Sequence, residues 1–313
     1  MQFLVTGGAG FIGSHIVERL VKEGGKVIVI DNLSTGKKGN IEKVIDKIKF
    51  IEGDIRDYEL LLSITKGVDY IFHEAAMTSV VKSIDDPKTC NEINITGTLN
   101  ILNTSLTNNV KKVIFASSSA IYGDSPILPK KETMKLEPKS PYAISKYTGE
   151  LYLKFFWEVK KLPCVSLRYF NVYGPRQDPN SPYSAVIPKF ISALLSSQNP
   201  IIFGDGEQTR DFVFVEDVVE ANLRAAEKEG VEGKVYNIGT GKKISVNHLF
   251  QIIKNLIGTD LNPIYKEERP GEIKDSFADI SMAEKELSFK PNFSLTSGLE
   301  KTIEWYKYNL QNT

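Results

Sequence analysis

The chain opens with Phe3-Leu4-Val5-Thr6-Gly7-Gly8-Ala9-Gly10-Phe11-Ile12-Gly13, and this stretch decides the fold. A short apolar run that ends at Thr6 predicts a buried strand. The glycine-rich turn after it lets the backbone approach a pyrophosphate, and a helix predicted over Phe11 to Lys22 turns its positive end toward the same group. The sequence therefore predicts a dinucleotide site, with contacts from Gly7, Gly10, Phe11, Ile12 and Gly13.

The end of the next strand indicates which dinucleotide binds. Lys26-Val27-Ile28-Val29-Ile30 is followed by Asp31 and Asn32. An acid at this place can hold both hydroxyls of the adenosine ribose, and it repels a 2′-phosphate. The first basic residue after Asp31 is Lys37. We therefore expect NAD rather than NADP, with Asp31 and Asn32 in the cofactor site.

Gly53-Asp54-Ile55 follows the third predicted strand. The segment suits a contact with the adenine, and it equally suits a simple turn. Asp54 and Ile55 are therefore candidates for contact with the cofactor.

Short β-branched runs alternate with amphipathic stretches along the first part of the chain. Strands are expected at Phe3 to Thr6, Val27 to Ile30, Lys49 to Glu52, Tyr70 to Phe72, Val113 to Ala116, Val165 to Tyr169 and Val235 to Ile238, with helices at Phe11 to Lys22, Thr89 to Asn108 and Pro141 to Lys160. Parallel strands need a crossover that a helix supplies, so this alternation predicts a doubly wound α/β sheet of the Rossmann type.

Beyond about Phe170 the alternation gives way to loops, with helices expected at Ala185 to Ser197, Val246 to Ile257 and Leu295 to Tyr308. We expect residues 1–172 plus about 214–239 to form the NAD-binding domain. Residues 173–213 plus 240–313 would form a smaller substrate-binding region.

The composition excludes several classes of partner. Lys plus Arg and Asp plus Glu both total 39, so no net field favours nucleic acid or an anionic membrane. Cys90 and Cys164 are the only cysteines, and they are expected to be buried thiols in a reducing compartment. The N-terminal residues carry no basic leader, and no apolar run approaches the length of a membrane span. We expect a cytoplasmic protein that acts on a small molecule and holds no metal.

Ser118, Tyr142 and Lys146 make a candidate catalytic set. Ser140-Pro141 predicts a helix start, which places Tyr142 and Lys146 in its first turns and, four residues apart, on one face. A nearby ammonium lowers the pKa of a phenol and makes it a usable base. Ser118 follows a strand at the carboxyl edge, where ligands of open α/β sheets bind, although a serine run alone more often caps a turn.

With these motifs in place, the chain resembles the extended short-chain dehydrogenase/reductase family, and within it the nucleotide-sugar 4-epimerases that act on UDP-glucose and UDP-N-acetylglucosamine. The resemblance covers nearly the whole chain. It is carried by the glycine turn, Asp54, His73-Glu74-Ala75-Ala76, Ser117 to Gly123, Tyr142 to Lys146, Arg168 to Pro175 and Arg210-Asp211-Phe212-Val213.

The resemblance implies a mechanism. Tyr142, held as phenolate by Lys146 and the nicotinamide charge, would take the proton of the sugar 4-hydroxyl while a hydride leaves C4 for tightly bound NAD, which each turnover regenerates. Ser118 would hydrogen-bond the same oxygen. Implied cofactor contacts further include Ala75, Ala76 and Tyr169, and implied UDP-sugar contacts are Ser79, Lys82, Ser118, Ser119, Asn171, Val186, Arg210 and Arg269.

Two departures from related enzymes narrow the activity. Related 4,6-dehydratases place an Asp-Glu pair after the catalytic hydroxyl, where this chain has Ser119 and Ala120. The same change argues, less firmly, against the decarboxylases of UDP-glucuronate. Members restricted to glucose and galactose carry a bulky Tyr where this chain has Ser276, so a 2-acetamido group is expected to fit.

Three hypotheses remain open. The first is a 4-epimerase that acts on UDP-GlcNAc and UDP-GalNAc and also on UDP-Glc and UDP-Gal. The second is another enzyme of the family, such as a UDP-glucuronate 4-epimerase, decarboxylase or 4,6-dehydratase, and the third is a non-catalytic NAD-binding scaffold. By resemblance, the helices Thr89 to Asn108 and Pro141 to Lys160 would pair across a two-fold axis into a homodimer. That four-helix interface would use the stripe of Tyr147, Leu151 and Phe155.

Overall fold

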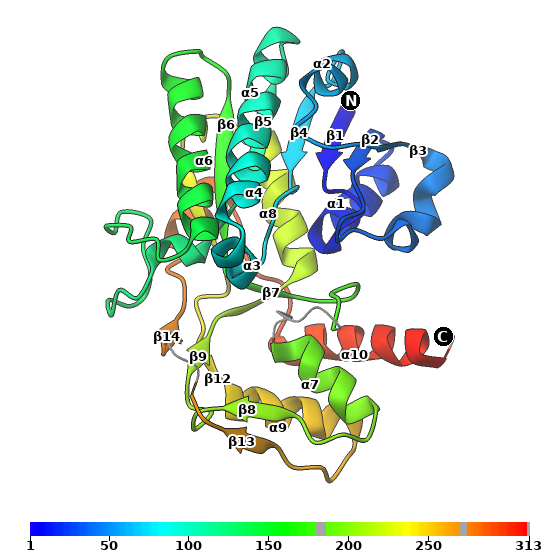
Figure 1. Ribbon diagram of the computed structural model, residues 1–313, viewed down its shortest axis with the longest axis vertical. Coiled ribbons are helices and arrows are strands. Elements are labelled where there is room, and N and C mark those ends of the chain that lie inside the picture. The colour runs from blue at the N-terminus through cyan, green and yellow to red at the C-terminus, as the bar shows by residue number, and fades with distance from the viewer. Residues whose placement is uncertain (180–185, 269–273, 312–313) are drawn as a thin grey trace.

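A seven-stranded parallel sheet forms the centre of the computed structural model, which describes residues 1–179, 186–268 and 274–311 (Figure 1). The strand order is β11-β6-β5-β4-β1-β2-β3. The strands are β1 (Gln2–Thr6), β2 (Lys26–Asp31), β3 (Ile48–Glu52), β4 (Tyr70–His73), β5 (Lys112–Ser118), β6 (Cys164–Tyr169) and β11 (Val235–Ile238). The predicted doubly wound sheet is confirmed, and each of the seven predicted strands takes part in it.

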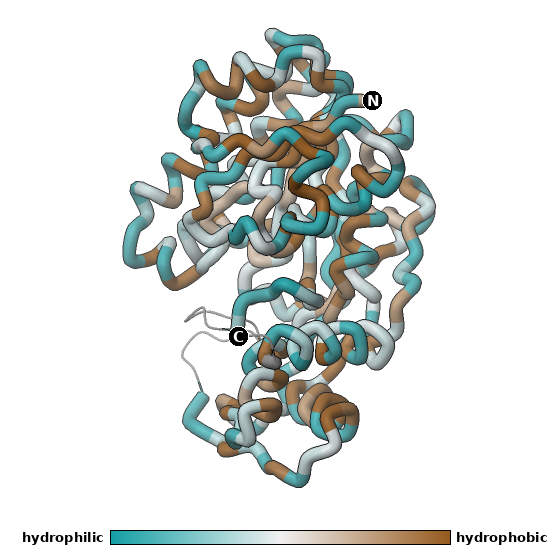
Figure 2. The backbone as a smooth tube through the Cα atoms, turned by 90° about the vertical axis from the view of Figure 1, so that its right-hand side faces the viewer, coloured by the Kyte–Doolittle hydropathy of each residue, from teal (hydrophilic) through white to brown (hydrophobic). Residues whose placement is uncertain are grey.

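Helices cover both faces of the sheet because successive strand residues point to opposite sides. Phe3 and Val5 of β1 join the hydrophobic cluster beneath α1 (Phe11–Lys22), α8 (Val215–Glu227) and the 3₁₀ segment η1 (Lys38–Lys47), whereas Leu4 joins the other cluster. That second cluster lies beneath α2 (Tyr58–Ile64), α5 (Gly97–Thr107) and α6 (Pro141–Glu158). Figure 2 shows the hydrophobic stretches grouped inside this part of the molecule. Both faces are therefore buried, as a parallel sheet requires.

The helix predicted over Thr89 to Asn108 is interrupted. It consists of α4 (Pro87–Asn91), a π-helical turn η2 (Glu92–Thr96) and α5. Asn94, inside the π-helical turn, accepts a hydrogen bond from the backbone N–H of Met77 at 2.8 Å and donates to Ser145 Oγ at 2.9 Å. These tertiary bonds favour a widened turn over a continuous α-helix, and such turns are frequent at functional sites.

The helix α6 begins as predicted and ends at Glu158 rather than Lys160. Ser140 caps it, because its Oγ accepts a hydrogen bond from the Ala143 N–H at 3.2 Å. The residues of the apolar stripe on α6 differ in exposure. Tyr147 is partly buried against the cluster around Ile121 and Phe170, whereas Leu151 and Phe155 are exposed.

A third hydrophobic cluster lies outside the sheet, around Phe190, Leu249 and Ile303. It is enclosed by α7 (Val186–Leu195), α9 (Val246–Ile257) and α10 (Leu295–Gln311), which lie below the sheet in Figure 1. The sequence predicts α7 as a helix over Ala185 to Ser197. Ala185 lies outside the described residues.

Short strands and turns complete the fold. They are β7 (Asn171–Tyr173) with β10 (Phe212–Phe214), β8 (Ile201–Phe203) with β13 (Ile264–Lys266), and β9 (Thr209–Arg210) between β12 (Ile244–Ser245) and β14 (Asp275–Ser276); α3 (Val80–Asp85), η3 (Ser119–Tyr122) and η4 (Ala283–Leu287) are single turns.

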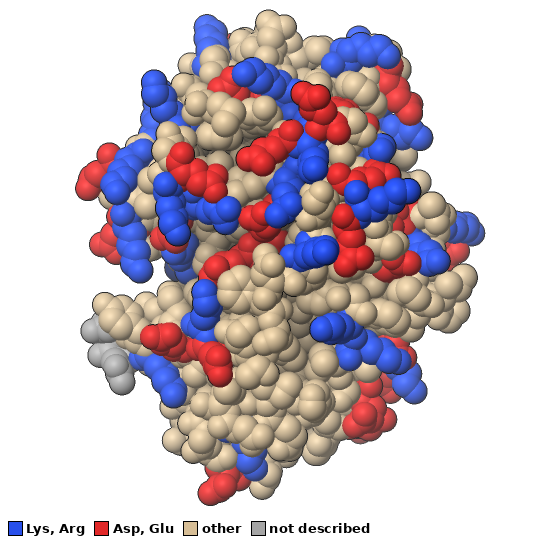
Figure 3. All heavy atoms as spheres, turned by 180° about the vertical axis from the view of Figure 1, so that it is seen from behind, with Lys and Arg blue, Asp and Glu red and all other residues tan. Residues whose placement is uncertain are grey.

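The surface carries both signs of charge. On the face shown in Figure 3, basic and acidic side chains are interspersed over the sheet domain. Within the described residues, no helix is both long and apolar enough to cross a membrane. Cys90 and Cys164 are free and buried, as expected.

Candidate active site

The glycine turn packs so tightly that side chains would not fit. Gly7 has φ +66°, and a Cβ there would lie 2.8 Å from the backbone nitrogen of Ala75. A Cβ on Gly13 would collide with the Gly7 carbonyl oxygen. Gly10 caps α1, and its N–H donates to Gly7 O at 3.0 Å. The backbone of the turn and the positive end of α1 are thus open to a diphosphate, which fits a dinucleotide.

Asp31 lies at the end of β2 beside this turn. Its two carboxylate oxygens accept hydrogen bonds from the N–H groups of Ala9 at 3.0 Å and Leu33 at 2.8 Å. Each oxygen keeps a second lone pair for a ribose hydroxyl. Lys37, the first basic residue downstream, forms an ion pair with Asp178 at 3.0 Å. This arrangement suits a ribose diol better than a 2′-phosphate, so the residues fit NAD.

Asn32, Asp54 and Ile55 lie at the neighbouring strand ends. Asn32 Nδ2 donates to Asp54 Oδ2 at 2.8 Å, and the side chain of Arg56 donates to both oxygens of Asp54. The hydrogen bonds from Arg56 lower the pKa of Asp54 to about 2. Ile55 is buried against Gly97. The structure brings these candidates together, and their contact with adenine stays a prediction.

Ser118, Tyr142 and Lys146 come together where β5 meets α6. Ser118 ends β5, and a hydrogen bond joins its hydroxyl to the Tyr142 phenol. Lys146 is almost fully buried, and its Nζ donates to the Ala116 carbonyl at 2.7 Å. The same Nζ lies 6.0 Å from the centroid of the Tyr142 ring. A hydroxyl, a phenol and an ammonium therefore share one site.

The expected effect of Lys146 on Tyr142 is wrong for the protein chain by itself. Burial raises the pKa of Tyr142 above its ordinary value, and the hydrogen bond from Ser118 opposes this only in part. Burial also lowers the pKa of Lys146 to about 8. The ammonium is directed at the Ala116 carbonyl rather than at the phenol oxygen, which explains why the phenol gains little from it.

A cavity of about 400 Å³ opens beside the catalytic set. It brings together Ser118, Ser119, Tyr142, Tyr169, Asn171, Arg210 and Ser276, seven of the residues singled out from the sequence. Ser276 of β14 pairs with Arg210 of β9 in parallel register, so the two residues are direct neighbours. Asn171 Nδ2 donates to the Asp211 carbonyl at 3.2 Å.

The buried carboxylate of Asp211 fastens the strands around this cavity. It accepts hydrogen bonds from the backbone N–H groups of Thr240, Gly241 and Ala278 at 2.8 to 3.1 Å. The residue directly before it is Arg210, and Ala278 lies two positions after Ser276. One side chain therefore holds both cavity strands against the end of β11.

The remaining candidate site residues with described positions do not line this cavity. Ser79 caps α3 by accepting from the Lys82 N–H at 3.1 Å, and Lys82 is exposed. Val186 begins α7, Ala76 follows β4, and Arg269 lies outside the described residues. The cavity wall also includes Val80, Tyr122, Phe170 and Lys130, which the sequence analysis missed. Lys130 comes from an irregular loop that pairs with Ala278, and no periodic pattern in the sequence marks such a contact.

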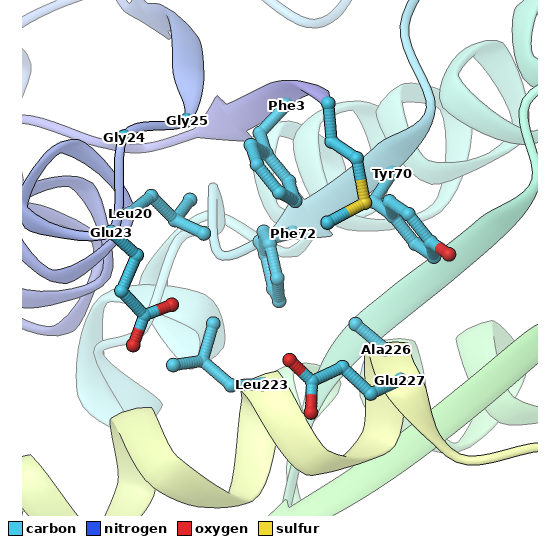
Figure 4. Close-up of a pocket in the computed structure, with 11 residues that line it drawn as sticks. Phe3, Leu20, Glu23, Gly24, Gly25, Tyr70, Phe72, Leu223, Ala226 and Glu227 are labelled. Atoms are coloured by element: carbon cyan, nitrogen blue, oxygen red, sulfur yellow. The ribbon is translucent and has the colours of Figure 1, made fainter.

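A second cavity, of about 150 Å³, lies at the amino end of the sheet (Figure 4). Phe3, Tyr70 and Phe72 line it from β1 and β4, and Leu223 faces them from α8. It lies away from the carboxyl edge where ligands of such sheets bind. In the described part of the chain, no group of three or more His, Cys, Asp and Glu residues is arranged to hold a metal ion.

Comparisons with known proteins agree with this site. A model of the NAD dependent epimerase/dehydratase family matches residues 3–239. A putative UDP-glucose 4-epimerase of Methanocaldococcus jannaschii is 46% identical over 98% of this chain and 99% of its own.

Two solved structures superpose closely. The UDP-N-acetylglucosamine 4-epimerase of Methanobrevibacter ruminantium M1, in complex with UDP-N-acetylmuramic acid, gives a TM-score of 0.95 at 46% identity and covers 98% of both chains. The UDP-glucose 4-epimerase of Thermotoga maritima, with UDP-glucose, gives 0.95 at 44% identity, covering 99% of this chain and 100% of that one.

Proposed function

Because this chain belongs to the NAD dependent epimerase/dehydratase family, we propose that it is an isomerase that interconverts the C4 epimers of a UDP-hexose. The observation that carries the proposal is the single cavity that joins Ser118 and Tyr142 to Asn171, Arg210 and Ser276. The Ser118 hydroxyl and the Tyr142 phenol meet there with residues suited to a nucleotide-sugar diphosphate. The substrates of the enzyme are UDP-GlcNAc and UDP-GalNAc together with UDP-Glc and UDP-Gal.

Tyr142 acts as the base that removes the proton from the sugar 4-hydroxyl, and later returns it. Ser118, hydrogen-bonded to Tyr142, holds the same sugar oxygen in line. Bound NAD would supply an acceptor for the hydride that leaves C4 of the sugar, and a positive charge near the phenol. Loss of the hydride gives a transient 4-keto sugar, and its return to the opposite face of C4 inverts that centre and leaves NAD unchanged over the cycle. Lys146, held by the Ala116 carbonyl, adds a second positive charge near the Tyr142 ring, with a smaller effect than the burial that raises the pKa of the phenol.

The cofactor is held along the carboxyl edge of the sheet. The residues that would contact it are Gly7, Gly10, Phe11, Ile12, Gly13, Asp31, Asn32, Asp54, Ile55, Ala75, Ala76, Tyr142, Lys146 and Tyr169. The tight packing of the glycine turn against Ala75 supports this assignment.

The UDP-sugar occupies the cavity. Guanidinium groups suit paired phosphate oxygens, so Arg210 and Arg269 hold the diphosphate together with Asn171. Ser276 leaves room for the 2-acetamido group, and Ser79, Lys82, Ser119 and Val186 complete the pocket. Neither Ser119 nor Ala120, both in the cavity wall, supplies the carboxylate that dehydration of the sugar requires.

The chain divides into two functional parts, with Ala283, Leu287 and Phe289 of the second part packed in the hydrophobic cluster of the sheet. Residues 1–172 plus about 214–239 bind NAD, and residues 173–213 plus 240–313 bind the UDP-sugar. The pairing of β11 with β6 and the separate cluster enclosed by α7, α9 and α10 support this division. Two free thiols and a small polar substrate fit a cytoplasmic enzyme.

The enzyme forms a homodimer through α6 and the helical segment α4–α5. Leu151 and Phe155 of α6, and Val159 directly after its end, are spaced four apart and expose 51%, 43% and 59% of their surface. An exposed apolar stripe of this kind is typical of a protein interface.

The proposal is tested by incubating the purified protein with UDP-glucose or UDP-N-acetylglucosamine, without added reductant, and resolving the products by proton NMR. A 4-epimer from each substrate is expected. Tyr142→Phe should keep bound NAD and lose turnover. Failure to form any 4-epimer, or release of water or carbon dioxide instead, would refute the proposal.

A further inference from the structure

Glu74 carries a carboxylate near the catalytic side chains, and the mechanism above does not use it. It follows His73, which pairs with Phe115 of β5, and the next residue of β5, Ala116, holds Lys146. Glu74 directly follows β4, and its backbone N–H donates to Thr6 O at 3.2 Å. Its Oε1 accepts a hydrogen bond from the Tyr169 phenol at 2.9 Å. Glu74 is mostly buried, and its backbone lies against Gly7 in the cofactor turn.

Asn222 of α8 lies beside the Tyr169 phenol. Its Nδ2 donates to the Tyr169 oxygen at 2.8 Å and to the Val218 carbonyl at 2.8 Å, which uses both amide protons. Two acceptors lie within reach of the Tyr169 proton, Glu74 Oε1 at 2.9 Å and Asn222 Oδ1 at 3.1 Å, and Glu74 is the nearer. Tyr169, which Asn222 holds in place, donates to Glu74 and so fixes the position of its carboxylate.

Several ionisable groups face this carboxylate or its neighbours. Lys146 and Tyr142 do so from α6, Tyr169 from β6, His73 from β4 and Cys90 from α4. Burial raises the pKa of Glu74 to about 7, while its hydrogen bond to Tyr169 and the charge of Lys146 act against that rise. Glu74 in turn raises the pKa of both Lys146 and Tyr142.

We propose that Glu74 is a positioning residue whose negative charge, held beside Tyr142 and Lys146, sets the pH range in which those two side chains have their working protonation states. The inference rests on the proposed function, because it concerns the same site. Glu74 is not a catalytic residue in this scheme, since it acts through Tyr142 and Lys146.

Glu74→Gln removes the charge while it keeps the volume and an oxygen that accepts from Tyr169. Loss of a neighbouring negative charge makes both a phenol and an ammonium give up their protons more readily. Both limbs of the pH profile of kcat/KM, measured on the holoenzyme with UDP-glucose, should therefore move to lower pH, by about one pH unit. A purely structural Glu74 would lower the rate with both limbs in place, and that result would overturn the inference.

A second readout does not depend on turnover. Ultraviolet difference titration of tyrosinate, wild type minus Tyr142→Phe, reports the ionisation of Tyr142, and the midpoint should fall when both proteins also carry Glu74→Gln. An unchanged midpoint would refute the inference even if the wild type forms no 4-epimer. The absence of a 4-epimer would instead count against the proposed function.

Two variants serve as controls. Glu74→Asp retains the carboxylate and should keep both limbs close to their wild-type positions. Glu59→Gln makes the same chemical change at an exposed position in the first turn of α2 and should leave the profile unaltered. Bound NAD and thermal melting are measured for each protein, so that a folding defect is recognised.

Discussion

At the scale of single residues, Ser276 is the position proposed to set the width of the sugar pocket. It lies in the cavity wall next to Arg210, so a larger side chain there would project beside the bound sugar. Ser276→Tyr should lower kcat/KM for UDP-N-acetylglucosamine at least about tenfold more than for UDP-glucose, because the ring takes the space of the acetamido group. Steady-state kinetics with both substrates measure the ratio.

Ser276→Ala is the matched control for this prediction. It removes the hydroxyl without filling the pocket, and it should leave the ratio of the two substrates nearly unchanged. Equal losses on both substrates in Ser276→Tyr would mean that this position does not face the 2-substituent.

Individual site residues could be predicted from the sequence where a local motif marks them. Ser118 follows a strand and Tyr142 follows a capped helix start, and the structure brings them into contact. Lys130 carries no such signal, and the motif that contains Glu74 does not show what this side chain contacts. Both depend on residues far away in the chain, Ala278 for Lys130 and Tyr169 for Glu74. The pKa of Tyr142 was misjudged for a related reason, since burial is a property of the fold rather than of a spacing.

At the scale of elements, the first turn of α6 holds Tyr142 in place. Ser140→Ala removes the bond that Ser140 Oγ accepts from Ala143 and should lower the free energy of unfolding by about 1 kcal/mol. Fraying of this turn should also reduce kcat, because Tyr142 lies two residues after the cap. Urea unfolding and steady-state kinetics test both effects.

Ser140→Thr provides the comparison, because it retains a hydroxyl that can cap the helix. It should keep most of the stability and most of kcat. If Ser140→Ala were as stable and as active as the wild type, the cap would not position Tyr142.

Helix boundaries followed the sequence where both ends carry local signals. Val246–Ile257 has the predicted bounds, with Ser245 accepting from the His248 N–H and Gly258 at φ +78° ending the helix. The break at Glu92–Thr96 was not predictable, because it depends on Asn94 reaching Met77 and Ser145 from other parts of the chain. Local chemistry sets helix ends, whereas tertiary hydrogen bonds set the π-helical turn.

At the scale of the whole molecule, the exposed apolar stripe along α6 indicates a protein interface. Phe155→Glu places an unpaired charge in the proposed interface, which costs a few kcal/mol once buried. Sedimentation equilibrium should show a homodimer for the wild type and mainly monomer for this variant. Ile264→Glu, at an apolar position of β13 with similar exposure, should remain dimeric. A wild type that sediments as a monomer would contradict the proposal.

The pairing of β14 with β9 has a consequence for how such a chain changes over generations. Backbone hydrogen bonds, together with the Asp211 carboxylate, hold Ser276 beside Arg210 whatever side chain position 276 carries. Some serine codons differ from a tyrosine codon by a single nucleotide. If Ser276 and Arg210 act as proposed, one mutation would change which sugars are accepted while the contacts with the nucleotide are inherited unchanged, so a lineage would change its substrates without passing through an inactive ancestor.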